Sequence, residues 1–198
     1  MLFIQRDGVT GDVPFSGDAA RILKSGEVVR DWTSGGLLAD VPQGGGYTLE
    51  VRVGTTITSQ PLAIGIIVAT MGQSNIVRWL IDDTTIPAAP DTYQLGRDGK
   101  WTANVSGIGD RIFTGILAGA LGVPVAIIDA AKSGTGLVYE GDGNRGWWLD
   151  TAPTGLYPQA LNEIRGVTPR VEFVLWAQGE SDANRLVSTQ HYAAGLNT

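Results

Sequence analysis

The sequence contains no cysteine and only one histidine, His191. The lack of cysteine excludes disulfide bonds and thiolate metal sites, but it does not identify the compartment. The net charge is −6 and the sequence contains no cluster of Lys and Arg, so the charge pattern does not favour nucleic-acid binding. No apolar run reaches the length of a membrane span, and the N-terminus lacks the pattern of a signal peptide. We therefore expect no nucleic-acid or membrane partner. The localisation stays open, and an extracellular or virion-associated location is the one considered.

What the chain does contain is enough apolar material for a real core. It has 198 residues, of which 43% are hydrophobic and 17% are charged, a composition that argues against disorder. This length predicts one domain, or one domain with a small appendage.

Residues 1–60 are dominated by short segments separated by Gly-rich turns. In residues 47–53 the apolar side chains alternate with period two, which predicts a half-buried antiparallel strand. No group of acid–base residues lies in this region. We expect residues 1–60 to form a β-rich, partly sandwich-like accessory segment without a catalytic role.

From residue 61 to residue 198 the pattern becomes strand followed by helix. Strands that alternate with helices predict βαβ units and a parallel sheet. Only three strands are expected, so the sheet would be a minimal one. The strands are expected at 62–68, 123–130 and 171–176, the helices at 108–121 and 155–165, a weak helix at 188–196, and a loop at 82–99.

Each expected strand ends in a small polar turn, at residues 72–75, 133–136 and 178–180. The carboxyl ends of parallel strands share one edge of a sheet, where ligands bind in open α/β folds. A serine hydroxyl with converging backbone and amide donors is what acyl transfer requires. Gly134 suits such a place because it has no side chain to obstruct a ligand. Ser74 can serve as the nucleophile, and it can equally be a serine that only caps the following helix.

Two motifs carry a resemblance: Gly-Gln-Ser-Asn at 72–75 and Trp-Ala-Gln-Gly-Glu-Ser-Asp at 176–182, with a Gly-Thr turn between them. Over about residues 62–185 the chain resembles the sialate O-acetylesterase-like branch of the SGNH (GDSL-type) hydrolases, which includes acetylxylan esterases. The resemblance implies a three-layer α/β/α flavodoxin-like fold and no cofactor or metal. It further implies hydrolysis of O-acetyl esters on a carbohydrate, such as sialic acid or xylan, through an acyl-serine intermediate.

The resemblance also implies roles for individual residues. Ser74 matches the nucleophile, and its N–H, the N–H of Gly134 and the side-chain amide of Gln178 match the oxyanion hole. Residue 133 departs from the family's usual Gly-Gly-Thr, since Ser precedes Gly134 here. Asn75 and Glu180 are expected to support the site, with Glu180 bracing it rather than acting as the base.

One expected block is missing. Members of the branch place Asp-x-x-His after the last strand, and no such motif occurs in this sequence. His191 has no Asp three positions before it, so we expect it on the surface of a helix or packed against one. The simplest expectation is a chain that ends before the block. The alternative function is a non-catalytic carbohydrate-binding or structural module, for example of a phage tail or cell-surface protein.

The remaining expectations concern aromatic and acidic residues. Trp147 and Trp148 suit either sugar stacking or cover for the edge of the core. Trp176 is expected in the core. A sheet this small exposes a strand edge, which predicts self-association through it. Most of the aspartates in or near the strand-end region are expected to be caps or solvated groups; the four are Asp110, Asp129, Asp142 and Asp182.

Overall fold

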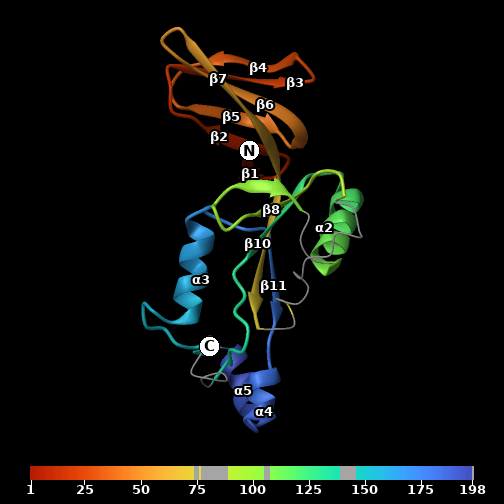
Figure 1. Ribbon diagram of the computed structural model, residues 1–198, viewed down its shortest axis with the longest axis vertical. Coiled ribbons are helices and arrows are strands. Elements are labelled where there is room, and N and C mark those ends of the chain that lie inside the picture. The colour runs from red at the N-terminus through yellow and green to blue at the C-terminus, as the bar shows by residue number, and fades with distance from the viewer. Residues whose placement is uncertain (74–75, 77–88, 105–107, 139–145, 198) are drawn as a thin grey trace. The chain divides into compact units, whose positions relative to one another are not determined.

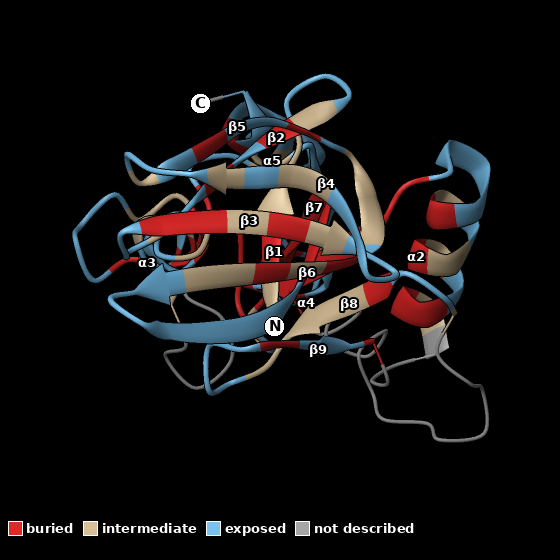
Figure 2. Cartoon of the chain, turned by 90° about the horizontal axis from the view of Figure 1, so that it is seen from above, coloured by how far each residue is buried: buried red, intermediate tan, exposed pale blue. Residues whose placement is uncertain are grey.

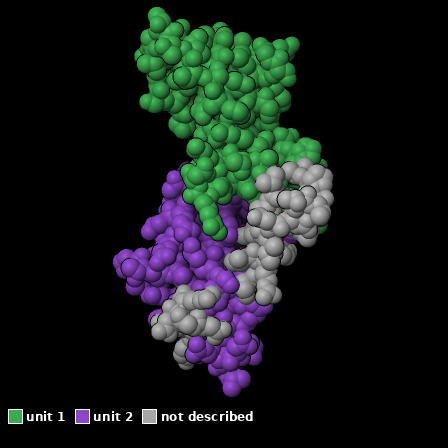
Figure 3. All heavy atoms as spheres, viewed as in Figure 1, with its two compact units in different colours: residues 1–67, 87–105, 111–126 green, residues 68–86, 106–110, 127–198 purple. Residues whose placement is uncertain are grey.

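A computed structural model describes residues 1–73, 76, 89–104, 108–138 and 146–197. The chain divides into two compact units, shown in different colours in Figure 3. The first unit comprises residues 1–67, 87–105 and 111–126, and the second comprises residues 68–86, 106–110 and 127–198.

The first unit consists largely of strands, most of which pair antiparallel (Figure 1). In chain order these are β1 (Leu2–Gln5), β2 (Thr10–Pro14), β3 (Ala19–Lys24), β4 (Glu27–Thr33), β5 (Leu37–Pro42), β6 (Gly44–Val53), the first part of β7 (Thr56–Gly72), β8 (Thr92–Leu95) and β9 (Trp101–Ala103). Strand β3 lies between β4 and β6, and β6 also pairs with β7. Strands β2 and β5 form a separate antiparallel pair.

Both groups of strands contribute to one core, because each strand turns alternate side chains inward. In β6, Tyr47 and Leu49 are buried and their neighbours are not, which confirms the predicted half-buried strand. Figure 2 shows the same alternation of buried and partly buried positions along β3. The buried cluster consists of Val13, Ala20, Ile22, Leu38, Val41, Tyr47, Leu49, Leu62 and Ile64.

Strand β1 pairs in parallel with β7, with Leu2 opposite Leu62. The sequence did not indicate this pairing, since four residues are too few to establish a period. The predicted loop at 82–99 is also wrong in its later part: residues 92–95 form β8, which pairs with β9, while residues 82–88 lie outside the described residues. The short alternation of Thr-Tyr-Gln-Leu was hidden among glycines, prolines and charged residues.

Helix α2 (Ile108–Leu121) has the predicted bounds, but its apolar row is not its buried face. Ile112, Ile116 and Leu121 are 47%, 67% and 44% exposed, whereas Arg111 and Thr114 are buried. Periodicity identifies a helix from the spacing of its apolar residues, and it does not tell which surface covers them. These three apolar side chains of α2 are therefore exposed in the structure.

The second unit contains the carboxyl ends of two strands, the whole of a third strand, and helices that follow them. In chain order its elements are the last part of β7, the end of β10 (Val125–Asp129), α3 (Leu156–Arg165), β11 (Phe173–Ala177), α4 (Glu180–Asn184) and α5 (Thr189–Leu196). The predicted strands at 62–68, 123–130 and 171–176 are confirmed with shifted ends, as are the helices at 155–165 and 188–196.

These strands run in parallel. Strand β11 pairs with β7 from Val68 opposite Phe173 to Gly72 opposite Ala177. On its other edge, β7 accepts hydrogen bonds from the segment that follows β10. Ala130 N–H donates to Thr70 O at 3.0 Å, and Lys132 N–H donates to Gly72 O at 2.9 Å, so both segments run in the same direction. The fold is therefore mixed α/β with parallel strands, as expected. The predicted division at residue 60 falls within β7 and stays a prediction.

Candidate functional site

The first polar turn begins where β7 ends. Gly72 has φ +115°, and a Cβ there would lie 2.0 Å from Ala177 O, so only glycine allows β7 to approach the end of β11 this closely. Gln73 N–H donates to Ala177 O at 2.8 Å. The first and third turns therefore lie side by side. Ser74 and Asn75, the predicted nucleophile and its neighbour, lie outside the described residues.

Gln73 connects these turns through its side chain. It is 1% exposed, and its amide nitrogen donates to the carboxylate of Glu180. Its Oε1 accepts from Gln178 Nε2 and from Ser181 N–H, both at 3.2 Å. The residue directly before Ser74 thus holds two residues of the third turn and Ser181, which follows it. We did not single out Gln73 from the sequence, although it lies within the motif that carries the resemblance.

The second turn meets the same cluster through Thr135. Its carbonyl oxygen accepts from Gln178 Nε2 at 2.9 Å, and its hydroxyl donates to Lys132 O at 2.8 Å. Gly134, the predicted backbone donor, directly precedes it with φ +76°. All three turns expected from the sequence therefore converge in the second unit, joined by the side chain of Gln178.

Gln178 has two Nε2 protons, and both are engaged within the protein. One is donated to Thr135 O and the other to Gln73 Oε1. To stabilise an oxyanion, Gln178 must give up one of these partners. The bond to Gln73 is the longer of the two, and Gln73 Oε1 would keep the Ser181 N–H as a donor.

Glu180 begins α4 and accepts the Gln73 amide, a geometry that fits the expected bracing role. Asp182 lies in the same helix and was expected to be a cap or a solvated group. It is instead 1% exposed, and its carboxylate accepts from Leu137 N–H at 2.7 Å and Val138 N–H at 3.0 Å. Asp182 therefore anchors the chain that follows the second turn. Its place two residues after Glu180 in the motif was the available signal.

Asp129 ends β10, directly before the second turn. Its carboxylate accepts from Thr70 Oγ1 at 3.0 Å and from Ala131 N–H at 3.1 Å. The residue as a whole keeps an exposed surface, yet the atoms packed around the carboxyl group desolvate it and raise its pKa. These two donors favour the charged form and oppose that shift.

The two loop tryptophans differ in exposure. Trp148 is 3% exposed, donates from Nε1 to Thr135 Oγ1 at 3.0 Å, and packs edge-on against Trp176 with centroids 5.1 Å apart. Its ring covers the core, so the structure favours that role over sugar stacking for Trp148. Trp176 was expected in the core, but it is 37% exposed. Trp148 covers one part of that ring and leaves the rest in solvent.

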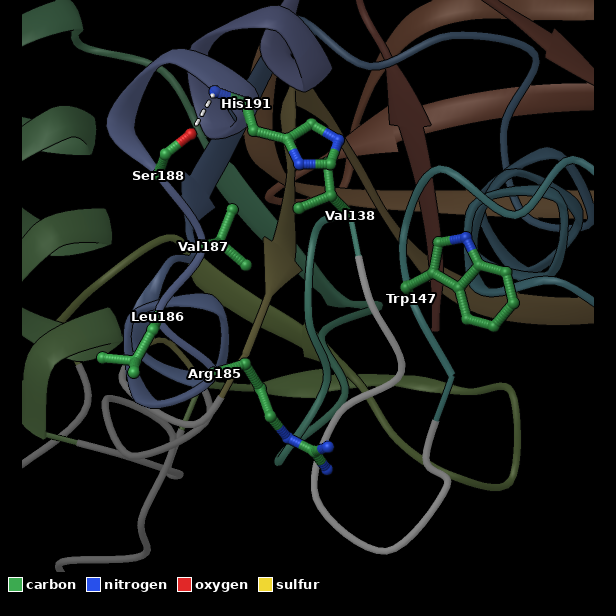
Figure 4. Close-up of a pocket in the computed structure, with 7 residues that line it drawn as sticks. All are labelled: Val138, Trp147, Arg185, Leu186, Val187, Ser188 and His191. Carbon is green, nitrogen blue, oxygen red and sulfur yellow. Dashed lines mark hydrogen bonds between the residues drawn. The ribbon is translucent and has the colours of Figure 1, made fainter.

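Trp147 lies on a pocket of about 730 Å³ within the second unit (Figure 4). His191 lines it too, in the first turn of α5, where its backbone N–H donates to the capping hydroxyl of Ser188 at 3.2 Å. His191 is exposed, as predicted for a residue on a helix surface. The other lining residues are Val138, Arg185, Leu186, Val187 and Ser188.

Two further properties bear on the chemistry. Among the described ranges, no three or more His, Cys, Asp and Glu residues gather as a metal site would require. In that same part of the chain, every helix is too short or too polar to cross a membrane.

Polar turns that converge after parallel strands are consistent with a hydrolase-type α/β fold. The chain belongs to the family described as carbohydrate esterase, sialic acid-specific acetylesterase (SASA), whose model matches residues 95–198, just over half of the sequence. The resemblance seen in the sequence is thereby confirmed. The matched range holds the second and third turns, and the first turn precedes it.

Solved structures give a fold comparison. XAC1771, a carbohydrate acetylesterase from Xanthomonas citri, aligns with a TM-score of 0.55 and 20% identity, over 91% of this chain and 49% of its own. The chain thus spans about half the length of that relative. An Arabidopsis thaliana protein, AT4G34215, aligns with a TM-score of 0.43 and 19% identity, over 66% of this chain and 68% of its own. A search of curated proteins finds no match.

Proposed function

We propose that the protein hydrolyses O-acetyl esters on a carbohydrate, with Ser74 as the nucleophile of an acyl-serine mechanism. The observation that carries the proposal is the hydrogen-bonded cluster of Gln73, Thr135 and Gln178, which joins the three turns. Ser74 is the next residue after Gln73 in the chain. Membership of a carbohydrate esterase family supports the class of reaction and substrate.

In this proposal the oxyanion is held by the N–H groups of Ser74 and Gly134 and by the amide of Gln178. A preorganised set of donors stabilises charge that develops in the transition state. Gln178 changes partner when the acyl oxygen arrives, because its bond to Gln73 can be exchanged while Ser181 still donates to Gln73. Asn75 and Glu180 support the site, and Trp147 offers the ring against which a sugar can stack.

The proposal also includes the finer fold and the domain division. The second unit has parallel strands and helices of the kind that an SGNH-type, flavodoxin-like α/β/α domain contains. Residues 61–198 would form that hydrolase domain, and residues 1–60 an accessory β-rich segment.

The decisive experiment is labelling with a serine-reactive fluorophosphonate, with Ser74→Ala as the control. Labelling of the unaltered protein that disappears in the variant is expected, because an activated hydroxyl attacks the phosphorus and expels fluoride while a base accepts the serine proton. No Asp-x-x-His block occurs in this sequence, so labelling would assign that base to His191 or to a partner chain. Acetate release from O-acetylated sialic acid and from acetylated xylo-oligosaccharides then identifies the sugar. A protein that neither reacts with the probe nor releases acetate contradicts the proposal.

Gln178→Ala tests the oxyanion hole. Loss of one such donor lowers kcat by about two to three orders of magnitude, and steady-state hydrolysis measures it. Because Gln178 also bonds Thr135, circular dichroism must show that the variant is folded. A folded variant with unchanged kcat removes Gln178 from the oxyanion hole.

A further inference from the structure

The side chain of Tyr192 ties helix α5 to the third turn. Its hydroxyl lies 2.9 Å from Gln178 O and 3.2 Å from Gln178 Oε1, so it can share its proton between the two oxygens. Gln178 Nε2 meanwhile donates to Thr135 and Gln73. Every polar atom of the Gln178 side chain thus has a partner.

Packing fixes the tyrosine in this place independently of its hydrogen bonds. Gly179 has φ +134°, and a Cβ there would lie 3.3 Å from the Tyr192 hydroxyl oxygen and 3.5 Å from Cζ. The ring therefore occupies the space beside the turn that a side chain at 179 would need. At the other end of α5, a Cβ on Gly195 would lie 2.8 Å from Val138 Cγ1, so the helix is closely docked.

The surroundings of Tyr192 keep its hydroxyl a donor. Burial raises the pKa of Tyr192 above its ordinary value of 10, and the nearby Asp182 carboxylate raises it further. At neutral pH the hydroxyl therefore carries its proton.

A carboxamide has two orientations, which exchange its oxygen and its nitrogen. If Gln178 were turned over, its oxygen would face the acceptors Thr135 O and Gln73 Oε1, and its nitrogen would face the Tyr192 hydroxyl. The observed orientation gives each acceptor a donor. Donation to Oε1 also polarises the amide and strengthens the hydrogen bonds that Nε2 donates.

We propose that Tyr192 is a positioning residue, whose hydroxyl fixes the Gln178 carboxamide with Nε2 directed at the second turn. The orientation itself follows from the contacts above. Its consequence for catalysis rests on the proposed function, in which Nε2 stabilises the acyl oxygen.

Tyr192→Phe removes the hydroxyl and leaves the ring that packs on Gly179. In nitrogen-15 NMR spectra, assigned with the Gln178→Ala variant, we expect both Nε2 protons of Gln178 to shift. Their exchange with solvent should become roughly two- to tenfold faster, as the loss of one hydrogen bond predicts. The matched control is Tyr157→Phe, because Tyr157 lies on α3 and is 46% exposed. Gln178 signals that are identical in Tyr192→Phe and in the unaltered protein overturn the proposal.

Hydrolysis of an acetyl ester gives the second measurement. Tyr192→Phe is expected to lower kcat about tenfold with KM unchanged, while Tyr157→Phe leaves both unchanged. Altered Gln178 signals in a protein without esterase activity would support the positioning role and contradict the proposed function. Altered signals with unchanged kcat in an active protein would overturn the catalytic consequence of the positioning.

Discussion

At the scale of single residues, buried and partly buried polar side chains hold the turns of the second unit together. Gln73 joins the first turn to the third, Gln178 joins the third to the second, and Asp182 holds the chain that follows the second. A buried polar group costs free energy unless it is paired, so these residues stabilise one arrangement of the turns and penalise others.

Asp182→Ala is expected to destabilise the protein by about 2–4 kcal/mol, because two backbone N–H groups lose a charged acceptor. Urea denaturation monitored by circular dichroism measures the loss. The control is Asp150→Ala, since Asp150 accepts one N–H, from Ala152, at an exposed position. It should cost less than about 1 kcal/mol. Equal losses in the two variants would show that the buried bonds of Asp182 contribute nothing special.

Sequence reasoning located the three turns but not the connections between them. Strand ends are visible as apolar runs followed by small polar residues, which is how Gly134 and Gln178 were found. The partner of a glutamine can lie far away in the chain, 105 positions for Gln178 and Gln73, and no local pattern encodes it. For the same reason Asp182 was expected in solvent, although it accepts from residues 44 and 45 positions earlier.

At the scale of elements, α2 shows what periodicity cannot decide. Its bounds follow from the spacing of its apolar residues and from the Gly and Pro that come after it. Which face is buried depends on the surfaces that surround the helix. Ala118 is 8% exposed, whereas Ile116 is 67% exposed, the reverse of the order of their hydrophobicity.

Ile116→Lys is therefore expected to change the unfolding free energy by less than about 0.5 kcal/mol, as for an ordinary surface position. Ala118→Lys, in the same helix, should be strongly destabilising because it places a charge at a buried position. Thermal and urea unfolding of both variants measure the difference. A large loss of stability in Ile116→Lys would show that its side chain is covered in solution.

At the scale of the whole molecule, strand β11 is the element that bears on self-association. Among the described residues it pairs with β7 alone, and Phe173, Val174 and Trp176 are 44%, 50% and 37% exposed. An apolar strand with an unpaired edge is a template for another strand. The self-association expected from the sequence stays a prediction, and the structure identifies the strand that would carry it.

Val174→Lys is expected to reduce self-association, since a lysine on an edge strand opposes strand pairing. Sedimentation velocity over a tenfold range of protein concentration measures the effect. Leu186→Lys is the matched control, because Leu186 is 90% exposed and lies outside the strand. If the unaltered protein is monomeric throughout, or if both variants associate alike, β11 is not the interface.

The pairing of β7 with β11 also implies a delay during synthesis, because the two strands are far apart in the sequence. Val68 of β7 lies opposite Phe173 of β11, so β11 leaves the ribosome about 105 residues after the end of β7. At about 5–20 residues per second, that interval is roughly 5–20 s. During that interval the apolar end of β7 has no β11 to pair with, so it presents an apolar segment to which a nascent-chain chaperone can bind.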